Sequence, residues 1–381
     1  MRIGIDAREV VGQATGVGRY LSELVARWTR DPHAARHHLV LFLPMSLART
    51  AIVGTGGASA EFAVVPGAGG TAWEQWSLAR AARRAQLDVF FAPGYTAPLS
   101  LAMPVVVAMH DVSFAAHPEW FRWREGARQR MFARRTARRA ARVLTLTQFS
   151  RREISQHLGV EASGIQVIAP AVDGHPALKP AEDDGLTPSV AGAAFASPDH
   201  GGDILFAGSL FTRRHVVDLL TGFERVADAR DARLTLVGDD RTWPPQQIDA
   251  RIRASRHASR IMWFRWVSDA DLRRLYRRAR VFAFLSEYEG FGLTPLEALA
   301  TGVPALVADV PVAHEAYGEA AHYVQPDDPA AIGAALQVLL DDTPERRACL
   351  DAAPDVVARY SWARAARETL DVLESVGSTR P

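Results

Sequence analysis

The sequence predicts an α/β protein built from two doubly wound, Rossmann-like domains that face each other across a cleft. Short apolar runs rich in β-branched residues alternate with amphipathic helical stretches from one end of the chain to the other. The alternation is interrupted once, by a segment rich in Pro, Gly, Ala and Asp, and then starts again. A chain of 381 residues with 48% hydrophobic residues is long and apolar enough for two separate cores.

The interruption sets the expected domain boundaries. We expect a first domain over residues 1–175, a linker over 176–202 and a second domain over 203–360. Residues 361–381 are expected to form a C-terminal helix that packs back on the first domain, with Ser361 as its N-cap.

The expected strands follow the apolar runs. In the first domain they are Arg2–Ala7, His38–Leu43, Phe62–Val65, Val89–Ala92, Val105–Met109, Val143–Thr147 and Val167–Ala169. In the second domain they are Asp203–Gly208, Arg233–Val237, Ile261–Trp266, Val281–Leu285, Ala305–Ala308 and His322–Val324. In open α/β sheets of this kind, ligands bind at the carboxyl ends of the strands.

The composition excludes several classes of function. The formal net charge is +1, so the charge balance gives no reason to expect a nucleic-acid partner. Lys179, in the expected linker, is the only lysine, so Schiff-base chemistry would have to use it. The single cysteine, Cys349, excludes an internal disulfide and a cysteine-cluster metal site. The amino terminus lacks a signal-peptide pattern and the apolar runs are shorter than the ~20 residues that span a bilayer, so we expect a soluble cytoplasmic protein.

The segment from Ser286 to Pro304, SEYEGFGLTPLEALATGVP, carries the strongest functional signal. It follows an apolar, β-rich run, Arg280–Ser286, and joins a glycine-rich turn to the start of a helix. Such a turn presents backbone N–H groups and the positive end of a helix dipole to a phosphate. Gly290 and Gly292 let the backbone approach a ligand closely, and Glu289 can accept hydrogen bonds from two sugar hydroxyls. We therefore predict a site for a molecule that is part sugar and part diphosphate.

Glu297 has two interpretations. The run Thr294-Pro295-Leu296-Glu297 matches a capping box with proline at the first helical position, in which the glutamate accepts a hydrogen bond from a backbone N–H. The same carboxylate could contact a ligand. The two roles are compatible, so both stay open in the sequence.

Two arginines, Arg213 and Arg214, follow the strand that ends at Gly208. The helix dipole disfavours cations at a helix start, so it does not explain this pair. Because arginine forks match phosphate oxygens, we expect at least one of the two to bind a phosphate. Solvated surface charge is the alternative.

Two further strand ends are candidate sites. The first strand leads from Asp6 to Gly16-Val17-Gly18, a glycine-bearing loop before a helix that predicts either a phosphate contact or an ordinary turn. His110 and Asp111 end the strand Val105–Met109. The histidine could hydrogen-bond a sugar hydroxyl with Asp111 orienting it, or it could be a packed histidine beside a helix-capping aspartate.

The segment Glu119–Arg152 is dense in arginine and carries interleaved apolar residues. A basic helix with aromatics can lie on an anionic membrane, and an arginine-rich solvated face is the alternative of equal weight. The arginines are Arg122, Arg124, Arg128, Arg130, Arg134, Arg135, Arg138, Arg139 and Arg142, and the apolar residues are Trp120, Phe121, Trp123, Met131 and Phe132.

Asp269 and Asp271 match the spacing of an aspartate pair that can hold a divalent cation. Ser268 precedes them at an expected helix start, where acidic residues complement the helix dipole. We therefore interpret the pair as part of a helix start and expect no metal site.

Taken together, the motifs resemble those of the retaining glycosyltransferases of family four, which have the two-domain GT-B fold. The resemblance runs through IGIDAREVVGQATGVGRY, FFAPGYTAPL, MHDVSFAAHPEWF and GSLFTRRHVVDLL to EYEGFGLTPLEALATGVP, and so covers nearly the whole chain. The spacing of Glu289 and Glu297, with seven residues between them, is its most specific element. Within the family, the chain looks most like mannosyltransferases that build bacterial surface polysaccharide.

The resemblance implies a role for each matched residue. Glu289 would meet the donor sugar and Glu297 the ribose, Arg213 and Arg214 would bind the diphosphate, and His110 would lie near the anomeric carbon. Further substrate contacts are implied for Gly16, Gly18, Tyr95, Asp111, Gly208, Gly290, Phe291, Gly292, Leu293 and Thr294.

The sequence departs from the family pattern at Arg214, where lysine is usual, and at His215, where asparagine is common.

The resemblance implies a retaining, metal-independent glycosyltransferase with no cofactor, whose donor is a nucleotide sugar, with GDP-mannose the best candidate. A glycan or a lipid-linked oligosaccharide would be the acceptor, on the side of the first domain, and the basic segment would bring the enzyme to the inner face of the plasma membrane. The alternatives are a sugar-nucleotide epimerase on the same fold and a non-catalytic scaffold of a polysaccharide assembly complex.

Overall fold

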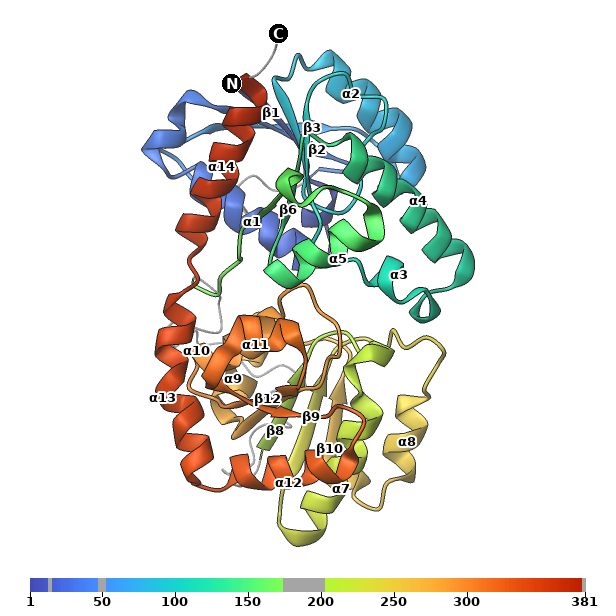
Figure 1. Ribbon diagram of the computed structural model, residues 1–381, viewed down its shortest axis with the longest axis vertical. Helices are drawn as coiled ribbons and strands as arrows, with labels where there is room; N and C mark the ends of the chain where they lie inside the picture. The colour runs from blue at the N-terminus through green and yellow to red at the C-terminus, as the bar shows by residue number, and fades with distance from the viewer. Residues whose placement is uncertain (13–15, 47–52, 174–202, 379–381) are drawn as a thin grey trace. The chain divides into compact units, whose positions relative to one another are not determined.

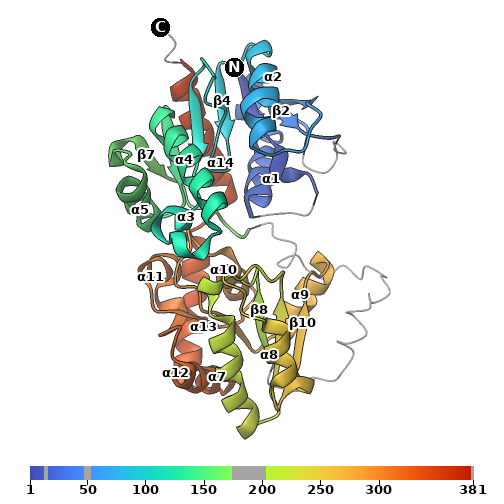
Figure 2. The same ribbon diagram turned by 90° about the vertical axis from the view of Figure 1, so that its right-hand side faces the viewer.

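The computed structural model describes residues 1–12, 16–46, 53–173 and 203–378, and it contains two α/β units (Figures 1 and 2). Unit 1 comprises Met1–Pro118, Trp123–Ala171 and Ser361–Pro381, and unit 2 comprises Glu119–Arg122 and Val172–Tyr360. The expected linker, residues 176–202, lies outside the described residues.

The short segment Glu119–Arg122 belongs to unit 2 rather than to the first domain in which the sequence analysis put it. Two aromatic contacts link it to that unit. The Trp120 ring lies edge-on to Tyr288, with the ring centroids 6.2 Å apart, and the Arg122 guanidinium lies 5.0 Å from the ring centroid of Trp243.

Unit 1 contains, within the described residues, a seven-stranded parallel sheet in the order β3-β2-β1-β4-β5-β6-β7. The strands are β1 (Arg2–Asp6), β2 (His38–Leu43), β3 (Ser59–Val64), β4 (Val89–Ala92), β5 (Val105–Ala108), β6 (Arg142–Thr145) and β7 (Ile165–Val167). The helices are α1 (Gly16–Trp28), α2 (Ala79–Arg84), α3 (Ser113–Ala116), α4 (Trp123–Arg139), α5 (Gln148–Leu158) and α14 (Trp362–Ser378). A π-helical stretch, Trp73–Leu78, leads directly into α2.

The C-terminal helix α14 lies beside α1 in unit 1 (Figure 1). The indole Nε1 of Trp28 donates a hydrogen bond of 2.7 Å to the Ala366 carbonyl, and the Trp362 ring packs against Tyr20. The Ser361 hydroxyl, just before α14, accepts from the Arg364 N–H at 3.5 Å. This helix therefore closes a unit whose other elements come from the first half of the chain.

Unit 2 contains, within the part of the chain described, a six-stranded parallel sheet in the order β10-β9-β8-β11-β12-β13. The strands are β8 (Asp203–Ala207), β9 (Arg233–Val237), β10 (Ile261–Phe264), β11 (Val281–Phe284), β12 (Ala305–Ala308) and β13 (Ala321–Val324). The helices are α7 (Val216–Ala229), α8 (Ile248–Ala254), α9 (Asp269–Arg278), α10 (Leu293–Ala300), α11 (Pro311–Tyr317), α12 (Pro329–Leu340) and α13 (Pro344–Ala358).

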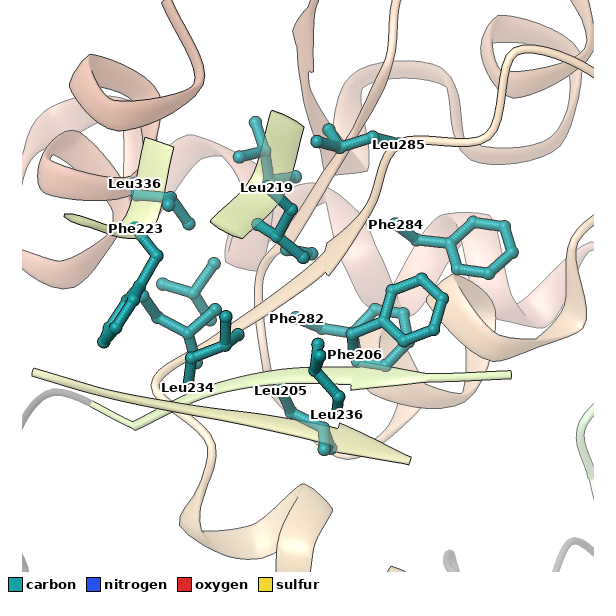
Figure 3. Packing of buried hydrophobic residues seen from close by; sticks show 14 of the residues in the cluster. Leu205, Phe206, Leu219, Phe223, Leu234, Leu236, Phe282, Phe284, Leu285 and Leu336 are labelled. Atoms are coloured by element: carbon teal, nitrogen blue, oxygen red, sulfur yellow. The ribbon is translucent and has the colours of Figure 1, made fainter. Parts of the chain in front are cut away.

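The core of unit 2 explains why its strands read as continuous apolar runs: helices cover the sheet, so both faces of a strand are buried (Figure 3). The ring of Phe206 in β8 stacks on the ring of Phe284 in β11, with their centroids 5.8 Å apart. The ring centroid of Phe282 lies 6.3 Å from that of Phe284. Leu219 and Phe223 of α7 pack into the same cluster. Each expected strand overlaps an observed one. The least accurate expectation is Val167–Ala169, because β7 is Ile165–Val167 and shares only Val167 with it.

Both sheets are doubly wound, and each reverses its strand order at one point. In unit 1 the reversal lies between β1 and β4, and in unit 2 between β8 and β11. Ligands of such sheets bind just outside the carboxyl ends of the strands at this switch point. The switch points bring together Asp6 and Pro93 in unit 1 and Gly208 and Ser286 in unit 2.

Candidate functional site

The structure places the predicted site residues in two groups. His110, Asp111, Tyr95, Gly16 and Gly18 belong to unit 1. The group in unit 2 consists of Gly208, Arg213, Arg214, Glu289, Gly290, Phe291, Gly292, Leu293, Thr294 and Glu297.

Arg213 is held rigidly at the switch point of unit 2. It lies in a short 3₁₀ turn, Thr212–Arg214, between β8 and α7, and it is 7% exposed. Its Nε donates to the Tyr288 carbonyl at 2.9 Å, and its guanidinium lies 4.4 Å from the ring centroid of Phe211. The loops after β8 and β11 are thereby joined through one arginine.

Arg214 and Glu289 form an ion pair across the same two loops. Nε and Nη2 of Arg214 lie 2.9 and 2.8 Å from one carboxylate oxygen of Glu289, and the Ser286 hydroxyl donates to that oxygen at 2.9 Å. Arg214 Nη1 donates to the Ser209 carbonyl at 2.8 Å. The space for this guanidinium requires Gly208, since a Cβ there would lie 2.6 Å from Arg214 Nη1, and the φ of +142° also favours glycine.

The Glu289 carboxylate is kept ionised by its neighbours. Its side chain is 14% exposed, and burial alone would raise its pKa. The positive charges of Arg214 and Arg213, together with the hydrogen bonds from Arg214 and Ser286, outweigh burial and lower the pKa of Glu289 below its ordinary value. At neutral pH the carboxylate is therefore an acceptor for hydroxyl groups.

The glycine turn is shaped by Gly292 and Tyr317. Gly292 has a φ of +84° and is the N-cap of α10, which begins at Leu293. The Tyr317 hydroxyl, at the end of α11, donates to the carbonyl oxygens of Gly292 at 2.6 Å and of Phe291 at 3.1 Å. A Cβ on Gly292 would lie 2.0 Å from that hydroxyl. The first N–H groups of a helix have no partner within it, and a glycine N-cap has no side chain to supply one, so this end of α10 suits an anion.

The capping box expected at Thr294–Glu297 is wrong. The helix begins one residue before Thr294, with Gly292 as its N-cap, so Thr294 lies inside the first turn. Glu297 is 1% exposed and accepts a hydrogen bond of 2.9 Å from the hydroxyl of Tyr276 in α9. Its role toward a ribose, which the resemblance implies, stays a prediction.

In unit 1, His110 follows β5 and is fixed by backbone rather than by Asp111. Its Nε2 lies 2.7 Å from the Pro93 carbonyl, which can only accept, so Nε2 carries the proton. Burial lowers the pKa of His110, an effect that the Pro93 hydrogen bond and the Asp111 charge oppose only in part, so the ring is neutral and Nδ1 is an acceptor. The Asp111 carboxylate instead accepts from the N–H and the hydroxyl of Ser113, at 2.9 and 2.7 Å.

Gly16 and Gly18 do not form the loop before a helix that we expected. They are the first and third residues of α1, and Gly18 is buried. Tyr95, after β4, is a strained residue with a φ of +61°, and its ring packs edge-on against His110 and Phe114.

The pair Asp269 and Asp271 opens α9, as expected. Ser268 is its N-cap, and its hydroxyl accepts from the Asp271 N–H at 3.1 Å. The Asp271 carboxylate is paired with Arg274 at 2.9 Å. Within the described residues, no group of three or more His, Cys, Asp and Glu side chains is arranged to hold a metal ion.

The arginine-rich segment folds mainly as α4. Trp123 and Met131 are exposed, at 76% and 41%, whereas Arg130 and Arg138 bond to the carbonyls of Phe114 and Leu158. In the described ranges, no helix is long and apolar enough to cross a bilayer.

Several residues of the site were not singled out in the sequence. Ser286 stands inside the motif that we quoted, and a hydroxyl next to two glutamates could have been noticed. Tyr276 and Tyr317 have no local signal, since each acts on a segment 18 or more residues away in the chain.

Comparisons with known families agree with this geometry. Residues 14–174 match the family described as Glycosyltransferase Family 4, and residues 201–342 match Glycosyl transferases group 1. The chain belongs to the family-four glycosyltransferases. The two matched regions together cover most of the chain. The first contains β2–β7 of the seven-stranded sheet, and the second contains all six strands of the other sheet of this GT-B fold.

Among curated proteins, this glycosyltransferase is similar to O-antigen chain mannosyltransferase B of Escherichia coli, with 26% identity over 286 residues, or 74% of this chain and 73% of that protein. It is also similar to the serotype-specific mannosyltransferase WbdA of Escherichia coli, with 28% identity over 152 residues, or 39% of this chain and 18% of that protein.

Among solved structures, the glycosyltransferase is similar in fold to HepE of Anabaena, crystallised in complex with UDP-glucose. The TM-score is 0.74 with 17% identity, over 98% of this chain and all of that one. WaaG, a glycosyltransferase involved in lipopolysaccharide biosynthesis, gives a TM-score of 0.74 with 17% identity, over 98% of this chain and 99% of that one.

Proposed function

We propose that this protein is a retaining, metal-independent hexosyltransferase of bacterial surface polysaccharide synthesis. It would move a hexose, with mannose from GDP-mannose as the best candidate, to a glycan or to a lipid-linked oligosaccharide. The observation that carries the proposal is the Arg213, Arg214 and Glu289 constellation at the switch point of unit 2, next to the amino end of α10. The names of the relatives, which include O-antigen mannosyltransferases, support mannose.

Each group of the constellation matches one part of a nucleotide sugar. The two guanidiniums and the first turn of α10 suit the diphosphate, whose charge grows as the leaving group departs. The ionised Glu289 suits the hydroxyls of the sugar ring. Substitution on one face of the sugar, within a tight ion pair, breaks the bond from the anomeric carbon to the phosphate oxygen and forms the bond to the acceptor oxygen. The acceptor proton passes to the leaving phosphate.

The test is a panel of nucleotide sugars in thermal-shift and transfer assays. A donor present at ~100 times its Kd stabilises the fold by about 2.7 kcal/mol, which is readily measured. GDP-mannose is expected to raise the melting temperature most, and UDP-glucose, which HepE binds, is the informative competitor. If UDP-glucose raises the melting temperature more than GDP-mannose does, UDP-glucose becomes the proposed donor. If the enzyme converts the donor to an isomer without any acceptor, the proposed reaction becomes epimerisation rather than transfer.

The stereochemical outcome is read from the product. NMR of the product's anomeric proton should show the configuration of the donor, because the proposed substitution keeps one face. An inverted product would contradict the mechanism while leaving the family unchanged.

A membrane location is part of the proposal. The exposed Trp123 and Met131 lie on α4 among exposed arginines, a combination that suits an anionic bilayer surface. An acceptor carried on a lipid would then be met at that surface.

A further inference from the structure

Unit 1 has a pocket at its own switch point. It has a volume of about 200 Å³ and lies outside the carboxyl ends of β1 and β4, between the loops that follow these strands and the helix α4. This is the position at which doubly wound sheets bind their ligands. Drug-sized ligands occupy pockets of roughly 300–1,000 Å³, so this smaller pocket suits a single ring.

The floor of the pocket is a buried ionic network. Arg8 lies between Asp6 and Glu74, which are 4% and 1% exposed, and it makes ion pairs with both. Gln75 and Thr96 also hydrogen-bond to the Glu74 carboxylate, at 2.6 Å each. Burial would lower the pKa of Arg8, but the charges of Asp6 and Glu74 outweigh it and raise that pKa, so Arg8 stays protonated.

The Arg8 guanidinium has little donor capacity left for a ligand anion. Its Nε donates to Asp6 at 2.9 Å, its Nη1 donates to the Gly69 carbonyl at 3.0 Å, and its Nη2 bonds to both carboxylates. Its face also lies against the Trp73 ring, 5.3 Å from the centroid. Four of its five N–H groups are thus engaged within the protein.

The remaining lining decides what the pocket can take. Carboxylates outnumber guanidiniums by four to two, the former being Asp6, Glu9, Glu74 and Glu125 and the latter Arg8 and Arg128. An anion would meet this excess of negative charge while Arg8 is committed to two carboxylates, which leaves Arg128 as its cationic partner. Carboxylate oxygens are good acceptors for hydroxyl groups, and the rings of Tyr95 and Phe132 supply an apolar wall for the C–H face of a ring. An uncharged, polyhydroxylated ring satisfies both conditions.

The pocket adjoins His110. The Pro93 carbonyl, which fixes His110 Nε2, and Tyr95, which packs against that ring, both belong to residues that line the pocket. A ring bound there would therefore lie next to the neutral histidine on the same edge of the sheet.

We propose that this pocket binds an uncharged hexose ring, namely the terminal residue of the acceptor, and that it excludes uronic acids and sugar phosphates. The assignment to the acceptor rests on the proposed glycosyl transfer. The binding of a neutral hexose in unit 1 does not depend on that transfer.

Ligand-observed NMR with simple glycosides tests the proposal without any donor. The probes are methyl α-mannoside, methyl α-glucoside and methyl α-glucuronide, the last two differing only at C6. Saturation transfer to the neutral glycosides and a signal at least tenfold weaker for the glucuronide are expected. Equal signals from the glucoside and the glucuronide, or no signal from any neutral hexoside, would overturn the proposal.

Two substitutions locate the binding. Gln129→Phe, on the pocket side of α4, should fill the space and abolish the hexoside signal, whereas Met131→Phe, exposed on the same helix, should not. Glu125→Gln should raise the glucuronide signal relative to the glucoside, and Glu345→Gln, exposed in unit 2, is its matched control. A hexoside signal that survives Gln129→Phe would place the binding elsewhere. Nucleoside diphosphate binding by calorimetry is measured on the same samples, so a failure of the proposed donor site is seen separately.

Discussion

Arg214 and Glu289 form an ion pair, with two guanidinium nitrogens within 2.9 Å of one carboxylate oxygen. The pair joins the loop after β8 to the loop after β11, which are the two loops at the switch point. Because protein groups hold both charges in place, little reorganisation would be needed for the proposed diphosphate and sugar to bind. Preorganised charge of this kind is the main means by which enzymes stabilise a departing anion.

The first prediction concerns the phosphate role of Arg214. Arg214→Ala should weaken nucleoside diphosphate binding by about 1.5–3 kcal/mol, the range for a charged hydrogen bond, which is roughly ten- to 150-fold in Kd. Calorimetric titration measures the change. Arg253→Ala, at an exposed position of α8, is the control and should bind like the wild type. Unchanged affinity in Arg214→Ala would exclude the phosphate role.

The second prediction concerns acid. The pKa of Glu289 is lowered below its ordinary value of 4.5, so the unfolded chain binds a proton more readily than the folded one, and stability rises with pH. The contribution of the ionised group is fully present above pH 4.5 and is lost as the pH falls through the lower, folded pKa. The melting-temperature difference between the wild type and Glu289→Gln should therefore shift against the wild type below pH 4.5. A shift in the other direction would show that burial dominates this pKa.

The third prediction concerns Tyr317, which positions the glycine turn. Tyr317→Phe keeps the ring but leaves the carbonyls of Phe291 and Gly292 without this donor, a loss of about 1–3 kcal/mol for buried groups. The donor KM should rise several-fold, because the turn that carries the N–H groups loosens. Tyr323→Phe removes a comparable bond to the Gly318 carbonyl, outside the turn, and is the matched control. If both variants lose the same stability and neither changes the donor KM, Tyr317 is only structural.

The fourth prediction concerns metal. Transfer should persist in excess EDTA, because the Asp271 carboxylate is already bonded to Ser268 and Arg274 at the start of α9. Asp269→Asn should lower stability by only about 0.3–1 kcal/mol, through the helix dipole, and should keep activity. Loss of activity on chelation, with recovery in magnesium or manganese, would show that the reaction needs a cation.

The sequence predicts the fold and the charged part of the site because both depend on local patterns. Buried parallel strands are continuous apolar runs, and Glu289 and Arg214 stand beside strand ends that those runs define. The positions at which our expectations failed depend on partners distant in the chain. The helix start at Gly292 is fixed by Tyr317, 25 residues later, and His110 is oriented by the carbonyl of Pro93, 17 residues earlier. Neither partner has a pattern that marks it.

The last prediction concerns the arginine-rich helix α4. An exposed basic residue contributes about 1 kcal/mol near an anionic surface, so the double change Arg134→Gln with Arg135→Gln should lower vesicle binding by roughly 30-fold. Both residues are exposed, and the same pair of changes at Arg251 and Arg253 of α8 is the control.

Co-sedimentation with anionic and neutral vesicles measures this attachment to the membrane. Binding to the anionic vesicles should fall as salt rises, because the attraction acts within a Debye length of about 10 Å at 0.1 M ionic strength. Trp123→Ala should weaken binding at every salt concentration, since the indole, 76% exposed, would contribute apolar contact rather than charge. Recovery of the wild type in the supernatant under all conditions would make the arginines a solvated face. The acceptor would then have to reach the enzyme from solution, and a soluble glycan would replace the lipid-linked oligosaccharide in the proposed function.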